Sequence, residues 1–374
     1  MPSHPDTVTR PSRQIHPQMY DTLHPSFTDS TDAPVDTGEY GNSYEIIPTA
    51  HTFFKSLKNR IRTASNSVDL QFYTLEADKE VLPILDASME AAQERDVTVR
   101  IQVDHLVSDP RQLISTLAAN RKMRRLPNVS VQTGREPGKL RNPLARDHKK
   151  IVAIDVGEPD EFVCVGGINL ANRSLRWNDF MVNLGGPIAG LVHQDFEDSW
   201  EHRNSAAKVI PEPGESGTFL LTDSHEDHQI VKFLQDRIRQ ATSRIWLETP
   251  YLDVPGIGAE LIEAKRNHPS LDVKVTVPRF NNYPVHRLRA NSMLSDLSKH
   301  GIETYQYGVT YRRLNHTKLL LIDDAAAFGS SNFNLSSMAG GNAEIEVVTQ
   351  NPQLVSRFED WYTEDIQDSI RHDR

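Results

Sequence analysis

The chain has 374 residues, of which 37% are apolar and 25% charged, and its formal net charge is −10 at pH 7. This length exceeds a minimal domain and suits one large two-lobed domain or two ordinary ones. The negative charge argues against a protein that coats nucleic acid wholesale. No window approaches the roughly 18 consecutive apolar residues that a membrane span requires.

The single cysteine, Cys164, excludes an intrachain disulfide and a zinc site built on several cysteines. It lies in the apolar run Phe162–Val165, which predicts a small buried side chain rather than a nucleophile. The chemistry of this chain is therefore expected to come from other side chains.

The first residues differ in composition from the rest. Residues 1–40 are rich in Pro, Ser, Thr and Asp and poor in branched aliphatic side chains, which predicts a disordered tail. His4, His16 and His24 have no metal-ligand spacing, so we expect them to be solvated. Residues 1–20 lack an apolar core, so we expect no signal peptide. A cytoplasmic location follows as the expectation, with peripheral contact to the inner face of the membrane left open.

After the tail the chain repeats itself. A segment with apolar residues at helical spacing occurs at Leu57–Ala64 and again at Leu234–Ala241. Each copy runs into a predicted strand, then a long helical stretch, then a second strand. The four strands are expected at Ser67–Tyr73, Val97–Val103, Arg244–Thr249 and Val273–Val277. This alternation predicts an α/β fold in which each half is a sandwich with a mixed β-sheet.

A linker separates the two copies. Ile210–Gly217 is rich in Pro, Gly and Glu, which is typical of a connecting segment. We therefore divide the chain into the tail (1–40), a first repeat (41–206) and a second repeat (207–374). Two similar lobes usually pack about a pseudo-twofold axis, which places equivalent loops face to face. This organisation predicts one active site that both halves share.

Each repeat contains the same motif, H-x-K-x4-D. The two copies are formed by His148, Lys150 and Asp155, and by His316, Lys318 and Asp323. Two matches at equivalent points of a repeat are far rarer by chance than one. The apolar runs after each lysine suit strands that are buried on both faces. Because alternate residues of a strand share a face, we expect each histidine beside its lysine, as half of a phosphate-handling site.

Further polar residues recur behind both motifs. Gly166–Asn169 follows the first motif and Gly329–Asn332 the second. Small residues let a backbone approach a ligand closely, and the amides of Asn169 and Asn332 can donate to a phosphoryl oxygen.

Two carboxylates stand beyond these strings, Asp179 in the first repeat and Glu344 in the second. A carboxylate that accepts a hydrogen bond from an imidazole fixes which ring nitrogen is free to react. The alternative is an ordinary surface acid, and the spacing leaves both interpretations open.

These residues form the pattern of the phospholipase D superfamily, and after the tail the chain resembles that family over nearly its whole length. Within the family it is most similar to bacterial cardiolipin synthases. Besides both motifs, the likeness rests on Gly41-Asn42, Val165–Asn169, Trp177–Asp179, Leu184–Pro187, Phe196–Trp200, Pro250-Tyr251 and Asn342–Glu344. The resemblance implies two phospholipase D-like repeats packed around one active site.

The chain departs from cardiolipin synthases in three places. We expect none of the membrane-spanning N-terminal helices that are common in them. The first half has a longer loop at Val156–Glu161, and Met338–Gly341 replaces an Arg-Ser-Phe-like stretch. These departures concern the lipid substrate rather than the phosphodiester chemistry.

The paired motifs predict a two-step mechanism. One histidine attacks phosphorus to form a phosphohistidine, while the other protonates the departing alkoxide and then deprotonates the incoming alcohol or water. Charge on the non-bridging oxygens would be stabilised by Lys150, Lys318, Asn169 and Asn332. Four such donors could replace a metal ion, so we expect neither a metal nor a cofactor.

The motif residues have unequal expected roles. Spacing leaves open which histidine is the nucleophile, whereas the resemblance implies that His148 attacks phosphorus and His316 is the acid. Asp155 and Asp323 are expected to be structural and to tie the ends of their strands.

The basic residues point to a phosphate-bearing partner. Those near the motifs are Arg141, Arg146, Lys149, Arg312 and Arg313. We expect the arginines among them to contact phosphate, whereas we expect the run Arg121–Arg125 to be a solvated face. The expected partners are a phospholipid substrate and an anionic membrane surface, with nucleic acid as the alternative.

Three functions fit the pattern. The leading one is phosphatidyl transfer on phospholipids. The second is a phospholipase D-type hydrolase or a nuclease with the same residues, and the third is a non-catalytic protein that binds lipid or nucleic acid. A lipid enzyme should show an apolar ramp beside the histidines, whereas a nuclease should show a continuous basic groove.

Overall fold

The computed structural model describes residues 41–105, 112–133, 146–203, 217–223, 229–253, 255–281, 283–309, 313–334, 337 and 341–372. The expected tail, most of the expected linker, Arg141 and Arg312 lie outside these ranges, as does the boundary between residues 206 and 207. The division into domains at those positions remains a proposal. Within these ranges no helix is long and apolar enough to cross a bilayer.

The first half is a mixed sheet of seven strands in the order β1-β8-β6-β5-β2-β3-β4. The strands are β1 (Ser43–Ile47), β2 (Ser67–Thr74), β3 (Thr98–His105), β4 (Val129–Thr133), β5 (Ile151–Ile154), β6 (Phe162–Gly166) and β8 (Met181–Gly185). The helices are α1 (Ala50–Thr63), α2 (Leu82–Glu94), α3 (Leu113–Met123) and α4 (Pro187–Trp200). The first three cover one face of the sheet, and α4 packs on the other.

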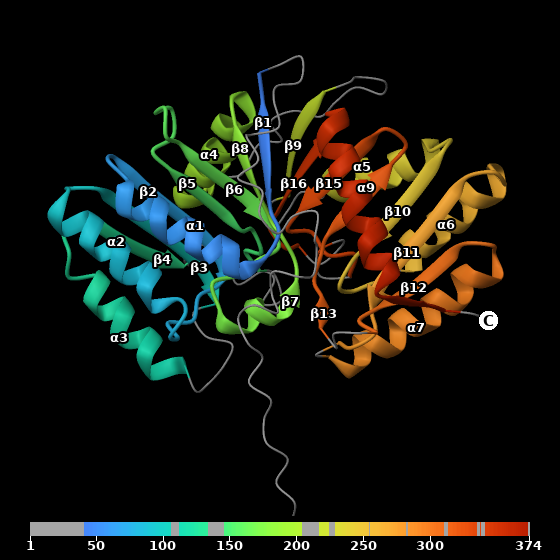
Figure 1. Ribbon diagram of the computed structural model, residues 1–374, viewed down its shortest axis with the longest axis horizontal. Coiled ribbons are helices and arrows are strands. Elements are labelled where there is room, and N and C mark those ends of the chain that lie inside the picture. Colours follow the sequence, from blue (N-terminus) through green and yellow to red (C-terminus); the bar gives the residue numbers. More distant parts are fainter. Residues whose placement is uncertain are drawn as a thin grey trace, which may run out of the picture.

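The second half repeats this plan with eight strands in the order β17-β12-β11-β10-β14-β15-β16-β9. The strands are β9 (Thr218–Asp223), β10 (Arg244–Glu248), β11 (Asp272–Pro278), β12 (Glu303–Tyr307), β14 (Leu319–Ile322), β15 (Ala325–Gly329), β16 (Glu344–Thr349) and β17 (Ser369–Arg371). The helices α5 (Gln229–Gln240), α6 (Pro255–Asn267) and α7 (Pro284–Lys299) cover the outer face, and α9 (Pro352–Gln367) covers the inner one. Figure 1 shows the two halves side by side. The predicted α/β class with a mixed sheet in each half is confirmed.

The patterns read from the sequence explain these elements. The repeated helices bury the expected apolar residues, among them Leu57 and Ile61 in α1 and Leu234 and Ile238 in α5. The four predicted strands form β2, β3, β10 and β11, with ends shifted by at most two residues. The short strands β5 and β14 are buried along their whole length, as expected for strands covered on both faces.

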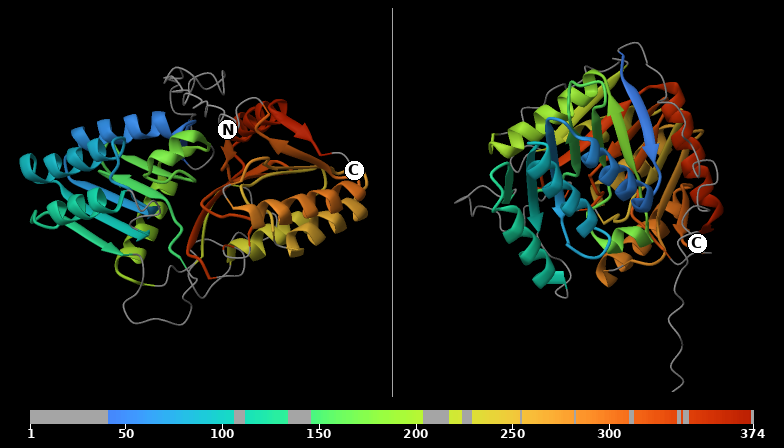
Figure 2. Two further views of the ribbon diagram at one scale, coloured as in Figure 1. Left: turned by 90° about the horizontal axis from the view of Figure 1, so that it is seen from below. Right: turned by 60° about the vertical axis from the view of Figure 1, so that its left-hand side comes forward.

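The two halves share a core. One apolar cluster contains residues from the inner faces of both sheets together with α4 and α9, so the two halves are not independent bodies. Phe180 of the first half lies 5.1 Å from Phe358 and 6.3 Å from Phe328 between ring centroids, and both partners belong to the second half. Figure 2 shows the two halves against each other from below.

Two backbone bridges also join the halves at the motifs. The strand β7 (Trp177–Asn178) pairs in parallel with β13 (Leu314–Asn315), and Asn178 lies opposite Asn315. The second bridge joins Asp147 to Ala343. In each bridge, the residue before a motif histidine pairs with the residue before Asp179 or Glu344. This equivalence is the pseudo-twofold relation expected from the repeats.

Candidate active site

The bridges carry each motif histidine to a carboxylate of the opposite half. The backbone N–H of His148 donates to the carbonyl of Ala343 over 2.9 Å, and that of His316 donates to the carbonyl of Asn178 over 2.7 Å. Glu344 therefore lies beside His148, and Asp179 lies beside His316.

The side chains complete this crossed pairing. Nδ1 of His148 lies 2.9 Å from Oε2 of Glu344 and 3.1 Å from the carbonyl of Ser330, and Nδ1 of His316 lies 2.6 Å from Oδ2 of Asp179. A carboxylate at Nδ1 holds the proton there, so the lone pair of each neutral imidazole is on Nε2. Both histidines are buried, which holds the rings in place.

The two lysines are anchored to their own histidines. Nζ of Lys150 donates to the carbonyl of His148 over 2.5 Å, and Nζ of Lys318 donates to the carbonyl of His316 over 2.6 Å. Each motif histidine is next to its lysine, as expected, but not because the two residues share one face of a strand. Both residues precede β5 or β14 instead of lying on the strand, and the carbonyl contact brings them together.

Burial changes the charge state of these groups. Burial lowers the pKa of Lys150 to about 7 and that of Lys318 to about 8, because the charged ammonium loses its solvation. Burial also lowers the pKa of His148, and it lowers that of His316 far below the ordinary value with the help of the Lys318 charge. An anion placed between these groups would favour their charged forms, so the site suits a phosphodiester.

The two carboxylates differ. Burial raises the pKa of Asp179 to about 7, although Lys318 opposes the change. Burial also favours the neutral form of Glu344, but the charges of His148 and Lys150 outweigh this effect of burial. The pKa of Glu344 therefore falls below its usual value. Glu344 gains further support from Ser330 and Ser337, whose hydroxyls donate to it over 2.5 and 2.7 Å.

The structure buries both asparagines that follow the motifs. Oδ1 of Asn169 accepts from the N–H of Thr74 over 3.1 Å, which leaves its amide hydrogens for another acceptor. Oδ1 of Asn332 is buried and finds no hydrogen-bond partner among the described residues. Each asparagine is 4% exposed, so both are held in the interior.

Sequence reasoning missed the aromatic rings that border the histidines. Tyr73 lies 5.0 Å from His148 between ring centroids, and Trp177 lies 4.5 Å from His316. Tyr251 meets His316 edge-on at 6.4 Å. Trp177 and Tyr251 belong to stretches that carry the family resemblance, but nothing in the sequence placed the three rings beside the histidines.

The reason given for the repeated glycines was wrong at Gly167. We expected small residues to let the backbone approach a ligand, but a Cβ at Gly167 would lie 2.3 to 2.7 Å from the carboxylate of Asp179. The missing side chain therefore makes room for the partner of His316. In the second half Ser330 takes the equivalent place and donates to Glu344.

The motif aspartates lie away from the histidines, at the far ends of β5 and β14. Both adopt a left-handed backbone, with φ of 49° at Asp155 and 48° at Asp323. Asp155 accepts from the backbone N–H groups of Ser65, Asn66 and Ser67 over 2.8 to 2.9 Å. Asp323 accepts in the same way from residues 242–244. These contacts support the expected structural role.

Lys149, which stands between two motif residues, is held in a buried ion pair. Its ammonium lies 2.8 and 2.9 Å from the two oxygens of Asp195 on α4, and only 2% of its side chain is exposed. Arg146 stays near the site edge, 3.8 Å from Asp104. Charge runs in a sequence do not distinguish a buried ion pair from a ligand contact.

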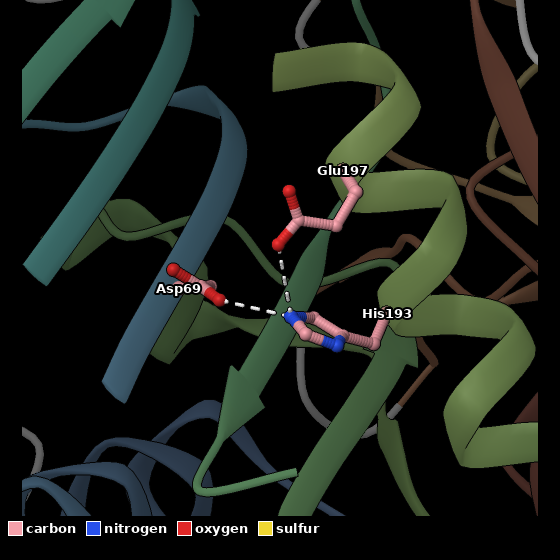
Figure 3. A group of neighbouring side chains, drawn as sticks. All are labelled: Asp69, His193 and Glu197. Atoms are coloured by element: carbon pink, nitrogen blue, oxygen red, sulfur yellow. Dashed lines mark hydrogen bonds and ion pairs between the residues drawn. The ribbon is translucent and has the colours of Figure 1, made fainter. Parts of the chain in front are cut away.

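One group of side chains has the composition of a metal site. Asp69, His193 and Glu197 place ligand atoms within 4.8 Å of one another (Figure 3). Arg100 already binds both carboxylates, with distances of 2.7 Å to Asp69 and 2.5 Å to Glu197. The guanidinium thus supplies the cation that a metal would provide, and the group is an ion network that joins β2, β3 and α4.

Comparisons with known proteins identify the family. The family model described as "Cardiolipin synthase, PLD-like domain" matches residues 57–200 and 234–366. The probable cardiolipin synthase YwiE of Bacillus subtilis (strain 168) is 24% identical over 88% of this chain and 67% of that protein. Cardiolipin synthase A of Proteus mirabilis (strain HI4320) is 24% identical over 85% of this chain and 68% of that protein. The crystal structure of phosphatidylserine synthase from Haemophilus influenzae Rd KW20 has a TM-score of 0.66 at 14% identity, and the match covers 88% of this chain and 87% of that one.

Proposed function

The chain belongs to the cardiolipin synthase, PLD-like domain family of the phospholipase D superfamily, and from this premise we propose that it transfers phosphatidyl groups through a phosphohistidine. It is an enzyme, and at the level of the family its activity is phosphatidyl transfer on phospholipids. The crossed pairs His148–Glu344 and His316–Asp179 carry the finer proposal, because one site then contains two oriented imidazoles.

In the first step, Nε2 of His148 attacks phosphorus and the bond from phosphorus to the departing alkoxide breaks. Protonated His316 donates its Nε2 proton to that alkoxide. In the second step, neutral His316 removes the proton from an acceptor alcohol. The alcohol oxygen then bonds to phosphorus, the phosphorus–nitrogen bond breaks and His148 is released.

The four neutral or cationic donors around the histidines stabilise charge on the non-bridging oxygens. Lys150 and Lys318 are anchored next to the imidazoles. Asn169 uses its Oδ1 to accept from Thr74, so its amide hydrogens can donate to the substrate. Donors that are already in place need no reorganisation during the reaction, which is the main source of such stabilisation. We propose that these donors serve in place of a metal ion.

The substrate proposal is a phospholipid at an anionic membrane surface on the cytoplasmic side. It is supported by the relatives named above, which are cardiolipin synthases and a phosphatidylserine synthase. Hydrolysis and nucleic-acid cleavage need the same two histidines and differ only in the acceptor or the substrate, so product analysis decides among them.

The experiment incubates the full chain and a chelator with phosphatidylglycerol vesicles or with single-stranded DNA, and identifies products by mass spectrometry. We expect a new phospholipid from the vesicles, and loss of turnover in His148→Ala and in His316→Ala. His268→Ala, which changes an exposed histidine outside the site, is the matched control. DNA cleavage without any new lipid would overturn the proposal, as would near-normal turnover in either active-site variant.

A further inference from the structure

The helices α3 and α7 begin at the edge of their sheets that carries the histidines. β5 begins at Ile151 opposite Gln71, near the end of β2, and the parallel neighbour β3 leads to α3. In the second half, β14 begins at Leu319 opposite Glu248, the end of β10, and the parallel neighbour β11 leads to α7. Figure 1 shows both helices on the lower side of the molecule, on either side of β7 and β13.

The first turns of these helices expose large apolar side chains. The large apolar residues that are exposed in the described ranges are Leu113, Ile114, Leu117, Tyr283, Val285, Leu288, Val309 and Ile370. Six of the eight lie within about two turns of the start of α3 or α7. Ile114 is 83% exposed and Leu288 is 70% exposed. Single exposed apolar residues are common, but a cluster on one edge marks an interaction surface.

Ring contacts join the start of α7 to the active site. Tyr283 lies 6.1 Å from Tyr251 between ring centroids, and Tyr251 lies 6.4 Å from His316. His286, the third residue of α7, also lies 5.0 Å from Tyr251 between ring centroids. The exposed start of α7 is therefore two ring contacts from a catalytic imidazole.

The start of α3 reaches the other half of the site. The hydroxyl of Thr116 accepts from the N–H of Ala77 over 2.9 Å. Glu76, which precedes Ala77, donates its N–H to the carbonyl of Leu170, and Leu170 follows Asn169. The two apolar helix starts thus stand on opposite sides of the same site.

Exposed cations accompany these apolar side chains. Arg287 and Arg289 of α7 are exposed, as is Arg176, which precedes the Trp177 that packs on His316. The segment Leu113–Met123 contains no acidic residue. Apolar side chains next to arginines suit an anionic lipid surface.

We propose that the first two turns of α3 and of α7, here called the docking turns, enter the headgroup layer of an anionic phospholipid bilayer and hold the histidine site against it. This inference rests on the proposed function, because it assigns the surface through which the same site meets its lipid. A nucleic-acid backbone would require cations where Ile114 and Leu288 stand. We assign to these two side chains the role of the apolar ramp expected of a lipid enzyme.

The first test measures how the full chain partitions onto vesicles in a flotation experiment. The vesicles contain phosphatidylglycerol and phosphatidylcholine. We expect Ile114→Ser combined with Leu288→Ser to weaken partitioning about tenfold or more, because two large apolar side chains no longer leave water. The matched control is Ile370→Ser, which removes an exposed apolar residue from β17, the outermost strand of the second sheet. Equal partitioning of the double variant and the unchanged protein would overturn the proposal that the docking turns enter the bilayer.

The second test varies charge. Arg176→Gln combined with Arg287→Gln should weaken partitioning onto phosphatidylglycerol vesicles several-fold at low ionic strength. Arg62→Gln, an exposed arginine in the last turn of α1, should leave it unchanged. Equal losses from both sets of substitutions would contradict a surface localised at the site.

A turnover measurement separates this inference from the proposed function. The ratio of turnover on vesicles to turnover on detergent-dispersed phosphatidylglycerol should fall in the Ile114 and Leu288 double variant. If the chain partitions as expected but forms no new phospholipid, the membrane contact of the docking turns is supported and the proposed function fails. Turnover in detergent together with an unchanged ratio would overturn the docking turns alone.

Discussion

At the scale of single residues, the two half-sites are alike in sequence but differ in electrostatics. Glu344 accepts from His148 and from two serine hydroxyls, and its pKa is lowered, so it is ionised at neutral pH. Asp179 has fewer donors, and burial raises its pKa to about 7. Environments that separate the pKa values of paired groups mark different roles in acid–base chemistry.

This difference supports the roles that the resemblance implies. A phosphohistidine at Nε2 of His148 with a proton on Nδ1 carries a positive ring, which the ionised Glu344 stabilises. His316 must instead give up and regain a proton in each cycle, and Asp179, with a pKa of about 7, suits that exchange. We therefore propose His148 as the nucleophile and His316 as the acid and base.

The lysines predict the alkaline limit of activity. The pKa values of Lys150 and Lys318 are about 7 and about 8, so each ammonium loses its proton, and with it the charge that stabilises the phosphoryl oxygens, as pH rises through this range. We expect kcat/KM on a soluble phosphodiester to fall between about pH 7 and 9, since this ratio reports the free enzyme. The limb in kcat should lie at higher pH because bound phosphate favours the charged lysines. A kcat/KM that stays level up to pH 10 would contradict this role.

At the scale of elements, the positions of the carboxylates depend on two short backbone bridges. The turn after β6 must leave room for Asp179, and it does so because residue 167 is a glycine. In the sequence, Gly166–Asn169 was interpreted as a ligand-binding turn. A string of small residues does not show which group fills the space beside it.

Gly167→Ala tests this local packing. The added Cβ would meet the carboxylate of Asp179, which cannot remain 2.6 Å from His316, so we expect turnover to fall at least tenfold while the chain stays folded. Gly190→Ala on α4 is the matched control, since no atom of the described residues lies within 4 Å of its added Cβ. That control should keep full turnover and gain about 1 kcal/mol of stability from helix propensity. The readouts are turnover and thermal unfolding, and full activity in Gly167→Ala would show that Asp179 needs no such room.

The sequence predicts the motif residues well and their partners poorly. His148, Lys150, His316 and Lys318 stand out because they recur at equivalent points of a repeat. The crossed pairing of Glu344 with His148 cannot be recognised in the sequence, because the bridge at Ala343 forms only when the two halves fold together.

The same limit applies to charge. Lys149 lies between two motif residues, yet its partner Asp195 is on a helix 46 residues later. The periodicity of α4 gives no sign that one acid on its inner face pairs with a motif-adjacent lysine. Local sequence patterns therefore gave the fold class and the candidate residues, whereas contacts across the halves required the folded chain.

At the scale of the whole molecule, one core serves both halves, and we expect them to unfold together. Phe358 of α9 is fully buried against Phe180 and Phe328, each 5.1 Å away between ring centroids. Phe358→Ala should lower the free energy of unfolding by about 3 to 5 kcal/mol. Denaturant titrations followed by circular dichroism and by tryptophan fluorescence should shift together in one transition. Two transitions, of which only one moves, would show that the halves are energetically separate.

We propose that the two halves contribute one nucleophile, His148, and one acid, His316, to a single site. The most direct measurement uses the p-nitrophenyl ester of phosphatidic acid, whose leaving group needs no protonation. In His316→Ala we expect a burst of about one p-nitrophenol per chain and a phosphatidyl adduct on His148, found by mass spectrometry, because the attack proceeds but the acceptor is no longer deprotonated. In His148→Ala we expect neither burst nor adduct. A burst in His148→Ala, or an adduct on His316, would contradict these roles of the two histidines.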